Sequence, residues 1–138
     1  MRSLAQRLIA EELRASSPPD ATESRAALRV CEKLRRPLSN FAGVAGFRSL
    51  LLRALALAKV EAPLLGGLKV KPDGTPEYST EFEAQLDSKP GAQASAALVE
   101  QLLALLITFI GEALTLRVVH DVWPRAALKD PKFGGKQL

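Results

Sequence analysis

The chain has 138 residues, of which 47% are hydrophobic and 5% aromatic, and it contains a single cysteine. This length fits one domain that buries about two thirds of its unfolded surface, and a composition rich in Leu and Ala favours helices over sheets. One cysteine excludes an intrachain disulfide framework and indicates a reducing compartment. We predict an all-α fold, a compact bundle of four to five helices around a long apolar C-terminal helix, with a short β-ribbon near residues 68–78. Residues 1–123 are expected to form a single helical domain, and residues 124–138 a flexible C-terminal tail.

The net charge of +4 is unevenly distributed: +6 in residues 1–60, −3 in residues 61–93 and +1 in residues 94–138. Such a distribution attracts opposite charges within one molecule, between copies or on a polyanion. Near the N-terminus, Glu11 and Glu12 interrupt the apolar stretch that a signal peptide requires. We expect a cytoplasmic protein, and the Ala-, Leu- and Arg-rich composition favours a bacterial one.

Capping residues, prolines and glycines divide the first two thirds of the chain into short elements. A first helix is expected over residues 3–15, ended by the Ser-Ser-Pro-Pro run that follows it. A second helix begins after Asp20 or Thr22, either of which would cap it, and Pro37 is expected to separate it from a third. The sequence then predicts the third helix over 38–60, strands over 68–71 and 76–78 around a turn at 72–75, a short acidic helix over 80–86 and a loop over 88–94.

The predicted third helix carries a strip of small side chains at helical spacing, Ala42, Ala45, Gly46 and Ser49. Because such a strip lets another backbone approach closely, we predict that it is a packing groove for the C-terminal helix. Six positions in this region also resemble a helix-turn-helix, which implies a polar reading helix after the turn. Residues 47–58 instead read FRSLLLRALALA, so one uninterrupted buried helix is the favoured interpretation. The positions that carry the resemblance are Phe41, Ala42, Ala45, Gly46, Leu52 and Leu55.

The segment from Leu98 to Trp123 is apolar on nearly every side, and such a helix must be buried in its own domain or against a second copy. Its uncharged run, residues 101–111, is about half as long as a membrane span. Glu100 and Glu112 flank this run, so we expect no membrane insertion. We predict that the helix forms the core and drives association into a homodimer or larger homo-oligomer. The residues assigned to core or self-association contacts are Leu98, Leu102, Leu105, Leu106, Phe109, Ile110, Leu116 and Trp123.

No constellation of residues indicates a reaction. His120 is the only histidine, and its neighbour Asp121 points to a different helical face. Cys31 is expected to behave as a small hydrophobe, and the acidic residues between 77 and 87 lack the spacing of a calcium loop. We expect no catalytic centre, no metal and no cofactor. The hypothesis of a small enzyme or ligand-binding bundle depends on Glu112 alone, a carboxylate in an apolar helix.

Two functional classes remain. The leading hypothesis is a non-enzymatic helical protein–protein interaction module, a self-associating adaptor, regulator or assembly subunit that binds a further protein partner. The alternative is a nucleic-acid-binding regulator, because basic residues recur at steps of four, four and three along the second helix and would follow phosphates. The candidate nucleic-acid contacts are this basic stripe, Arg25, Arg29, Lys33 and Arg36, together with Arg48 and Arg53.

Overall fold

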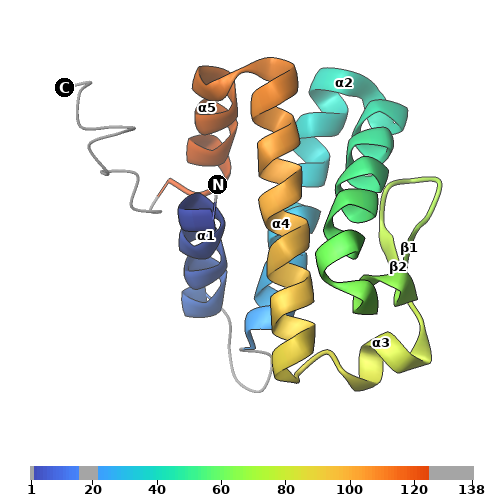
Figure 1. Cartoon of the computed structure of the whole chain (residues 1–138). Helices are drawn as coiled ribbons and strands as arrows, with labels where there is room; N and C mark the ends of the chain where they lie inside the picture. The colour runs from blue at the N-terminus through green and yellow to red at the C-terminus, as the bar shows by residue number, and fades with distance from the viewer. Residues whose placement is uncertain (1, 16–21, 125–138) are drawn as a thin grey trace.

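The computed structural model describes residues 2–15 and 22–124, and within these ranges the chain forms five α-helices and a two-stranded sheet (Figure 1). The predicted all-α bundle with a short ribbon is confirmed. Apart from Pro124, the predicted C-terminal tail lies outside the described residues. The elements in chain order are α1 (Arg2–Ala15), α2 (Glu23–Glu61), the 3₁₀ helix η1 (Pro63–Gly67), β1 (Leu68–Val70), β2 (Pro76–Tyr78), α3 (Thr80–Ala84), α4 (Lys89–Ile110) and α5 (Glu112–Val122).

α2 is a helical hairpin rather than a straight rod. At Gly43 the backbone leaves the helical region, with φ 84° and ψ 160°, and Figure 1 shows the chain rising before this point and descending after it. Leu28 and Leu51 line the same small cavity, although in a straight helix they would lie about 35 Å apart. Residues 23–42 and residues 44–61 are therefore two arms, referred to below as the first and second arm of α2.

Two helix boundaries predicted in this region are wrong. The helix expected to be uninterrupted reverses at Gly43, because glycine adopts a positive φ without the clash that a Cβ would cause. Pro37, expected to separate two helices, lies inside the first arm. A proline inside a helix removes one backbone hydrogen bond. Leu34 and Leu38 on either side of it are fully buried, and their packing holds the helix together through this point.

The C-terminal segment forms a second hairpin. Gly111 separates α4 from α5 and has φ 89° and ψ 159°, nearly the conformation of Gly43. The single rod predicted from Leu98 to Trp123 is wrong, since this segment folds back on itself and α4 also starts earlier. Ser88 caps α4 by accepting a hydrogen bond of 3.2 Å from a backbone amide of the first turn. Most of the loop predicted over residues 88–94 is therefore helical, and the proline in it occupies a first-turn position that needs no amide proton.

Both reversals use the same short pattern, Phe-x-Gly-x-Ala. The first hairpin has it at Phe41-Ala42-Gly43-Val44-Ala45, and the second has it at Phe109-Ile110-Gly111-Glu112-Ala113. The two tips lie at the same end of the bundle, at the top of Figure 1. Each tip thus places a phenylalanine two residues before the glycine that turns the chain.

The hydrophobic core lies between α1, the two arms of α2 and α4, with α4 at the centre of Figure 1. In Figure 1, α1 lies below α5, and Glu12 of α1 bonds to Trp123, the residue that follows α5. Packing of this kind explains why helices of modest intrinsic stability persist, since most helical stability in proteins comes from burying an apolar face. The largest fully buried side chains are Phe47, Phe82, Leu4, Leu8, Leu34, Leu38, Leu65, Leu98, Leu102, Leu103, Leu106 and Val30.

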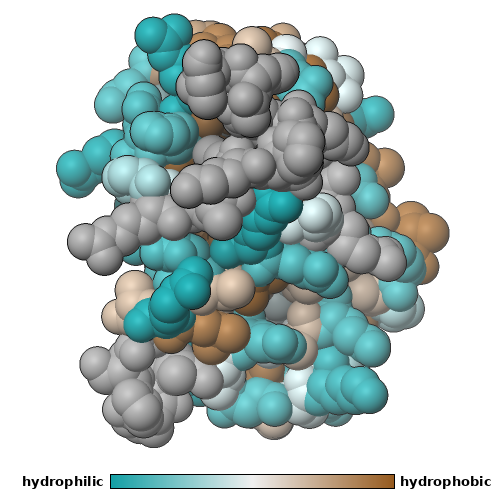
Figure 2. Space-filling model, turned by 90° about the vertical axis from the view of Figure 1, so that its left-hand side faces the viewer, coloured by the Kyte–Doolittle hydropathy of each residue, from teal (hydrophilic) through white to brown (hydrophobic). Residues whose placement is uncertain are grey.

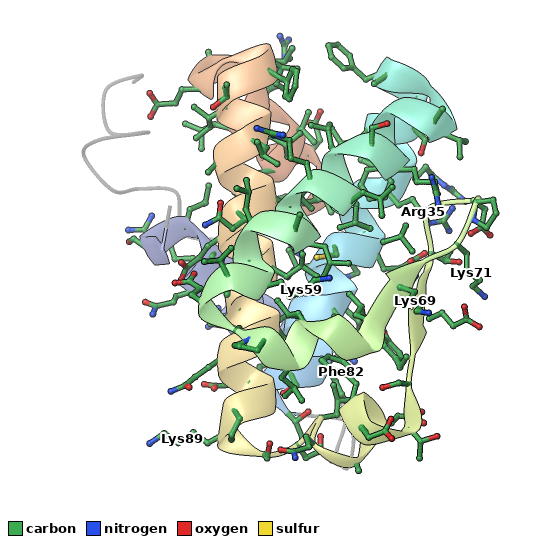
Figure 3. The ribbon with its side chains drawn as sticks, turned by 45° about the vertical axis from the view of Figure 1, so that its right-hand side comes forward. Arg35, Lys59, Lys69, Lys71, Phe82 and Lys89 are labelled. Carbon is green, nitrogen blue, oxygen red and sulfur yellow. The ribbon has the colours of Figure 1, made fainter. Side chains whose placement is uncertain are left out.

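The β-ribbon is attached to the bundle rather than free-standing. Its strands are antiparallel, with Leu68 opposite Tyr78, and the residues of β1 alternate between buried and exposed. Arg48 of α2 donates a hydrogen bond of 3.0 Å to the carbonyl of Lys71, and Phe82 of α3 is fully buried with its ring 5.6 Å from that of Tyr78. Figure 3 shows Phe82 beside the ribbon and Lys71 at its outer edge. A two-stranded ribbon is marginal alone, and these contacts stabilise it.

By length and composition alone, α2 and α4 would each be able to cross a membrane. A buried core helix has the same properties, and 44% of the apolar window of α4 and 28% of that of α2 are buried inside the bundle. The apolar window of α2 also extends across the reversal at Gly43. Figure 2 views the side formed by α1 and α5, where hydrophilic side chains surround smaller hydrophobic patches.

Candidate interaction site at the hairpin tips

An apolar groove of about 410 Å³ lies between α2 and the last turns of α4, near the tips of the two hairpins. Its walls come from both arms of α2 on one side and from α4 on the other. Only one of its lining residues is charged, and two are phenylalanines. The groove, called the tip groove below, is lined by Leu38, Phe41, Ala42, Gly46, Ser49, Leu50, Arg53, Leu106, Phe109 and Ile110.

Large apolar side chains are exposed around the tip groove. Phe41 is 58% exposed and Phe109 is 64% exposed, and Val44, next to Gly43, is 47% exposed. A single exposed apolar side chain is ordinary, whereas several gathered beside one groove are typical of an interaction surface. Fully burying such a side chain is worth roughly 1.5 to 3 kcal/mol. The tips therefore carry a driving force for association that the isolated bundle leaves unused.

The strip of small residues lies on this groove, but the C-terminal helix does not fill it. Ala42, Gly46 and Ser49 line the tip groove, and Ala42, Ala45 and Ser49 are exposed. The prediction that the strip is a packing groove for that helix is wrong in this respect. The C-terminal segment turns back at Gly111 instead of continuing along α2, so it leaves the strip open.

The residues predicted for core or self-association contacts divide into two groups. Leu98, Leu102, Leu106 and Trp123 are buried within the bundle. Phe109 is exposed on the rim of the tip groove. Between these extremes, three of the predicted residues are partly buried against the core: Leu105, Ile110 and Leu116. The part of the predicted set that is available to a partner is therefore confined to the end of α4.

Two residues of opposite charge lie close to the hairpin tips, Arg53 on the groove wall and Glu112 just after Gly111. Arg53 is exposed on the second arm of α2 and lines the groove. Glu112 is exposed in the first turn of α5, directly after Gly111. Within residues 2–15 and 22–124, neither side chain takes part in an ion pair or a side-chain hydrogen bond. Glu112 faces solvent, so the inward-facing carboxylate that kept an enzyme or a ligand-binding bundle open is not formed.

Carboxylates of the same chain hold three members of the basic stripe. Arg25 lies 3.4 Å from Asp87, and Lys33 and Arg29 lie 2.7 Å and 3.4 Å from Glu12. Of the other candidate nucleic-acid contacts, Arg48 is bound to backbone carbonyls of the ribbon, whereas Arg36 is exposed and Arg53 lines the tip groove. The stripe thus helps to hold the bundle together, and its charge is partly neutralised there.

Glu12 is the buried polar centre of the fold, and the sequence prediction missed it. The residue is 2% exposed, and its Oε2 accepts a hydrogen bond of 2.8 Å from Nε1 of Trp123. With Lys33 of α2 also on this carboxylate, the contact joins the first, second and last helical segments of the described chain. The spacing alone could have indicated that Glu12 faces the core, because it follows Leu4 and Leu8 at four-residue steps along the buried face of α1.

The side chains that were candidates for chemistry do not assemble into a site. Cys31 is buried, and burial, reinforced by the negative charge of Glu32, raises the pKa of its thiol to about 12. A thiol of this kind is a poor nucleophile near neutral pH. His120 is exposed on α5. Among the described residues, no three His, Cys, Asp or Glu side chains lie close enough together to hold a metal ion.

A second hollow, of about 600 Å³, lies away from the tips and is more polar. Gln6, Glu61, Gln93 and Glu100 line it together with prolines and alanines from η1 and the start of α4. Its carboxylates come from two helices, and none of its described lining residues is a buried polar side chain without a partner. The tip groove is therefore the better-defined candidate.

Comparisons of this chain with models of protein families, with curated proteins and with solved structures found no match. Interpretation of the site therefore depends on the geometry and chemistry of the chain itself.

Proposed function

We propose that this chain is a non-enzymatic helical protein–protein interaction module that associates with itself through the tip groove. In this role it acts as an adaptor, a regulator or an assembly subunit in the cytoplasm. One observation carries the proposal: two exposed phenylalanines, Phe41 and Phe109, flank an unfilled apolar groove that is lined by small residues.

The chemistry of the groove supports a protein partner over a charged or reactive one. Apolar walls with one charged lining residue gain free energy by excluding water, and aromatic side chains are enriched at the centres of protein interfaces. A polyanion would need free cationic groups, whereas Arg25 and Lys33 of the basic stripe are each paired with a carboxylate of the same chain. The chain has only five phenylalanines, and two of them lie at this groove, which also supports association through it.

Sedimentation velocity across micromolar to submillimolar concentrations tests the proposal. We expect a concentration-dependent dimer or larger oligomer for the unmodified chain and a shift toward monomer for Phe109→Asp, which places a charge on the rim of the groove. Val60→Asp is the matched control, because Val60 is 84% exposed and does not line the groove, and it should leave association unchanged. A monomer at every concentration, or equal effects of the two variants, would contradict the proposal.

A further inference from the structure

We infer that the tip groove is occupied by the hairpin tips of a second copy, in an antiparallel overlap related by a twofold axis. This inference rests on the proposed function and specifies its partner and geometry. In this arrangement the Phe109 ring of each copy enters the hollow formed by Ala42, Gly46 and Ser49 of the other. Each copy then completes the other's site.

The tip surface is complementary to itself. It presents projections, Phe41 and Phe109, and beside them a hollow whose wall consists of small side chains. An interface between identical copies around a twofold axis requires both features on one patch, because every contact is made twice with the roles exchanged. A different protein would require only one of them.

The two tips are also nearly equivalent to each other. Phe41-x-Gly43 and Phe109-x-Gly111 have matching backbone conformations at their glycines, with φ of 84° and 89°. The tip surface therefore has a phenylalanine on each side of the groove in a similar setting. A second copy approaching from the opposite direction presents the same pair of rings to the same pair of walls.

The charges near the tips also favour an antiparallel pairing of two copies. Arg53 lies ten residues beyond Gly43, which corresponds to roughly 15 Å along the second arm, whereas Glu112 lies at the tip itself. An antiparallel overlap of about three helical turns brings Arg53 of each copy to Glu112 of the other. These two exposed charges, which form no ion pair with any other described residue, then form two ion pairs between the copies. A parallel alignment would instead place Arg53 against Arg53.

A lipid surface is the principal rival occupant, since α2 and α4 are apolar enough to interact with one. The charges disfavour it. Glu112 at the tip would enter the membrane interface first, where anionic headgroups repel a carboxylate and no group of opposite sign is fixed opposite it. The second copy supplies that group in Arg53.

A charge-exchange experiment on the full chain tests this geometry. Arg53→Glu and Glu112→Arg should each weaken self-association by about tenfold to a hundredfold, because each creates two like-charge contacts per dimer. An equimolar mixture of the two variants should associate close to the unmodified level, since both contacts in the mixed dimer join opposite charges. The double variant should also recover. Raising the salt concentration should reduce all these differences.

Lys59→Glu is the control for a change of charge alone. Lys59 is exposed on the same arm, and Figure 3 shows it on α2 well below the hairpin tip. It lies six residues beyond Arg53, outside an overlap of three turns, so its reversal should have little effect. Circular dichroism checks that every variant remains folded, as expected for exposed positions.

The outcomes separate this inference from the proposed function. If the unmodified chain associates and Phe109→Asp abolishes association, but the mixed variants associate no better than each alone, the groove is an interface with a different geometry. If the chain stays monomeric and floats with phosphatidylglycerol-containing vesicles, both proposals are overturned and the surface belongs to a membrane. Preferential association of the two single variants with each other supports the antiparallel overlap.

Discussion

Replacing Glu12 tests whether the buried carboxylate stabilises the fold. Its side chain is 3% exposed, whereas Lys33 and Arg29 beside it are 46% and 33% exposed. Breaking a fully buried ion pair destabilises by about 3 to 5 kcal/mol, but these cations can return to water, which lowers the loss. Glu12→Gln keeps an acceptor for the indole of Trp123, so we expect a loss of about 2 kcal/mol. Glu12→Leu also leaves that N–H without a partner, which adds about 1 to 3 kcal/mol.

Urea unfolding measures these losses with two probes. Circular dichroism reports the helices, and fluorescence reports Trp123, the only tryptophan in the chain. The midpoints should fall with an unchanged dependence on urea, as for a change in stability alone. Glu11→Gln is the control, because the ion pair of Glu11 is with Arg14, whose side chain is 71% exposed, and such pairs contribute at most about 1 kcal/mol. Equal effects at positions 11 and 12 would refute the reasoning.

Two further predictions concern the chain reversals and the buried thiol. Gly43→Ala and Gly111→Ala should each lower the free energy of unfolding by about 1 to 3 kcal/mol in thermal unfolding, because a positive φ with ψ near 160° is a region essentially restricted to glycine. The added Cβ itself meets no neighbour within 4 Å. Gly66 lies in equally open space but has no positive φ, so Gly66→Ala should lower the stability less. An equal loss of stability in all three variants would contradict the role of the positive φ at the reversals. Cys31 should resist a disulfide reagent at pH 8 until urea unfolds the chain. In the folded chain the pKa of this thiol is about 12, above its ordinary value of 9.0, so between these values only the unfolded thiol ionises. Stability should therefore decrease as pH rises above about 9, and Cys31→Ala should reduce that decrease. Tyr78, whose pKa burial also raises, contributes in the same direction and remains in the variant.

The helices and the ribbon could be predicted from the sequence because their signals are local. Apolar side chains at three- and four-residue steps, caps and turn residues all act within one or two turns of chain. The reversals could not be predicted in the same way. Gly43 and Gly46 lie three residues apart, yet Gly43 turns the chain and Gly46 remains helical. Which glycine breaks the helix depends on what the arms can bury afterwards, and that is set by packing across the whole bundle.

The candidate site was predicted only in its parts. Spacing and hydrophobicity identify the strip of small residues and Phe109, but neither property indicates that they lie on one open groove. Their meeting depends on two reversals that bring both tips to the same end of the fold. The role of Glu12 was hidden for a similar reason, because its partner Trp123 lies 111 positions away.

The fold does not require the two exposed phenylalanines, Phe41 and Phe109. Glycine alone makes each reversal, and the space around Gly43 and Gly111 is open, so neither turn needs an aromatic ring for support. Phe47 and Phe82 are fully buried and belong to the core, whereas Phe41 and Phe109 keep more than half of their surface in water at equivalent positions. Exposed rings that the fold does not need are unfavourable in the isolated chain. In the dimer that we propose, contact with a second copy removes that surface from water, and Arg53 and Glu112, which form no ion pair within residues 2–15 and 22–124, can pair across the same contact.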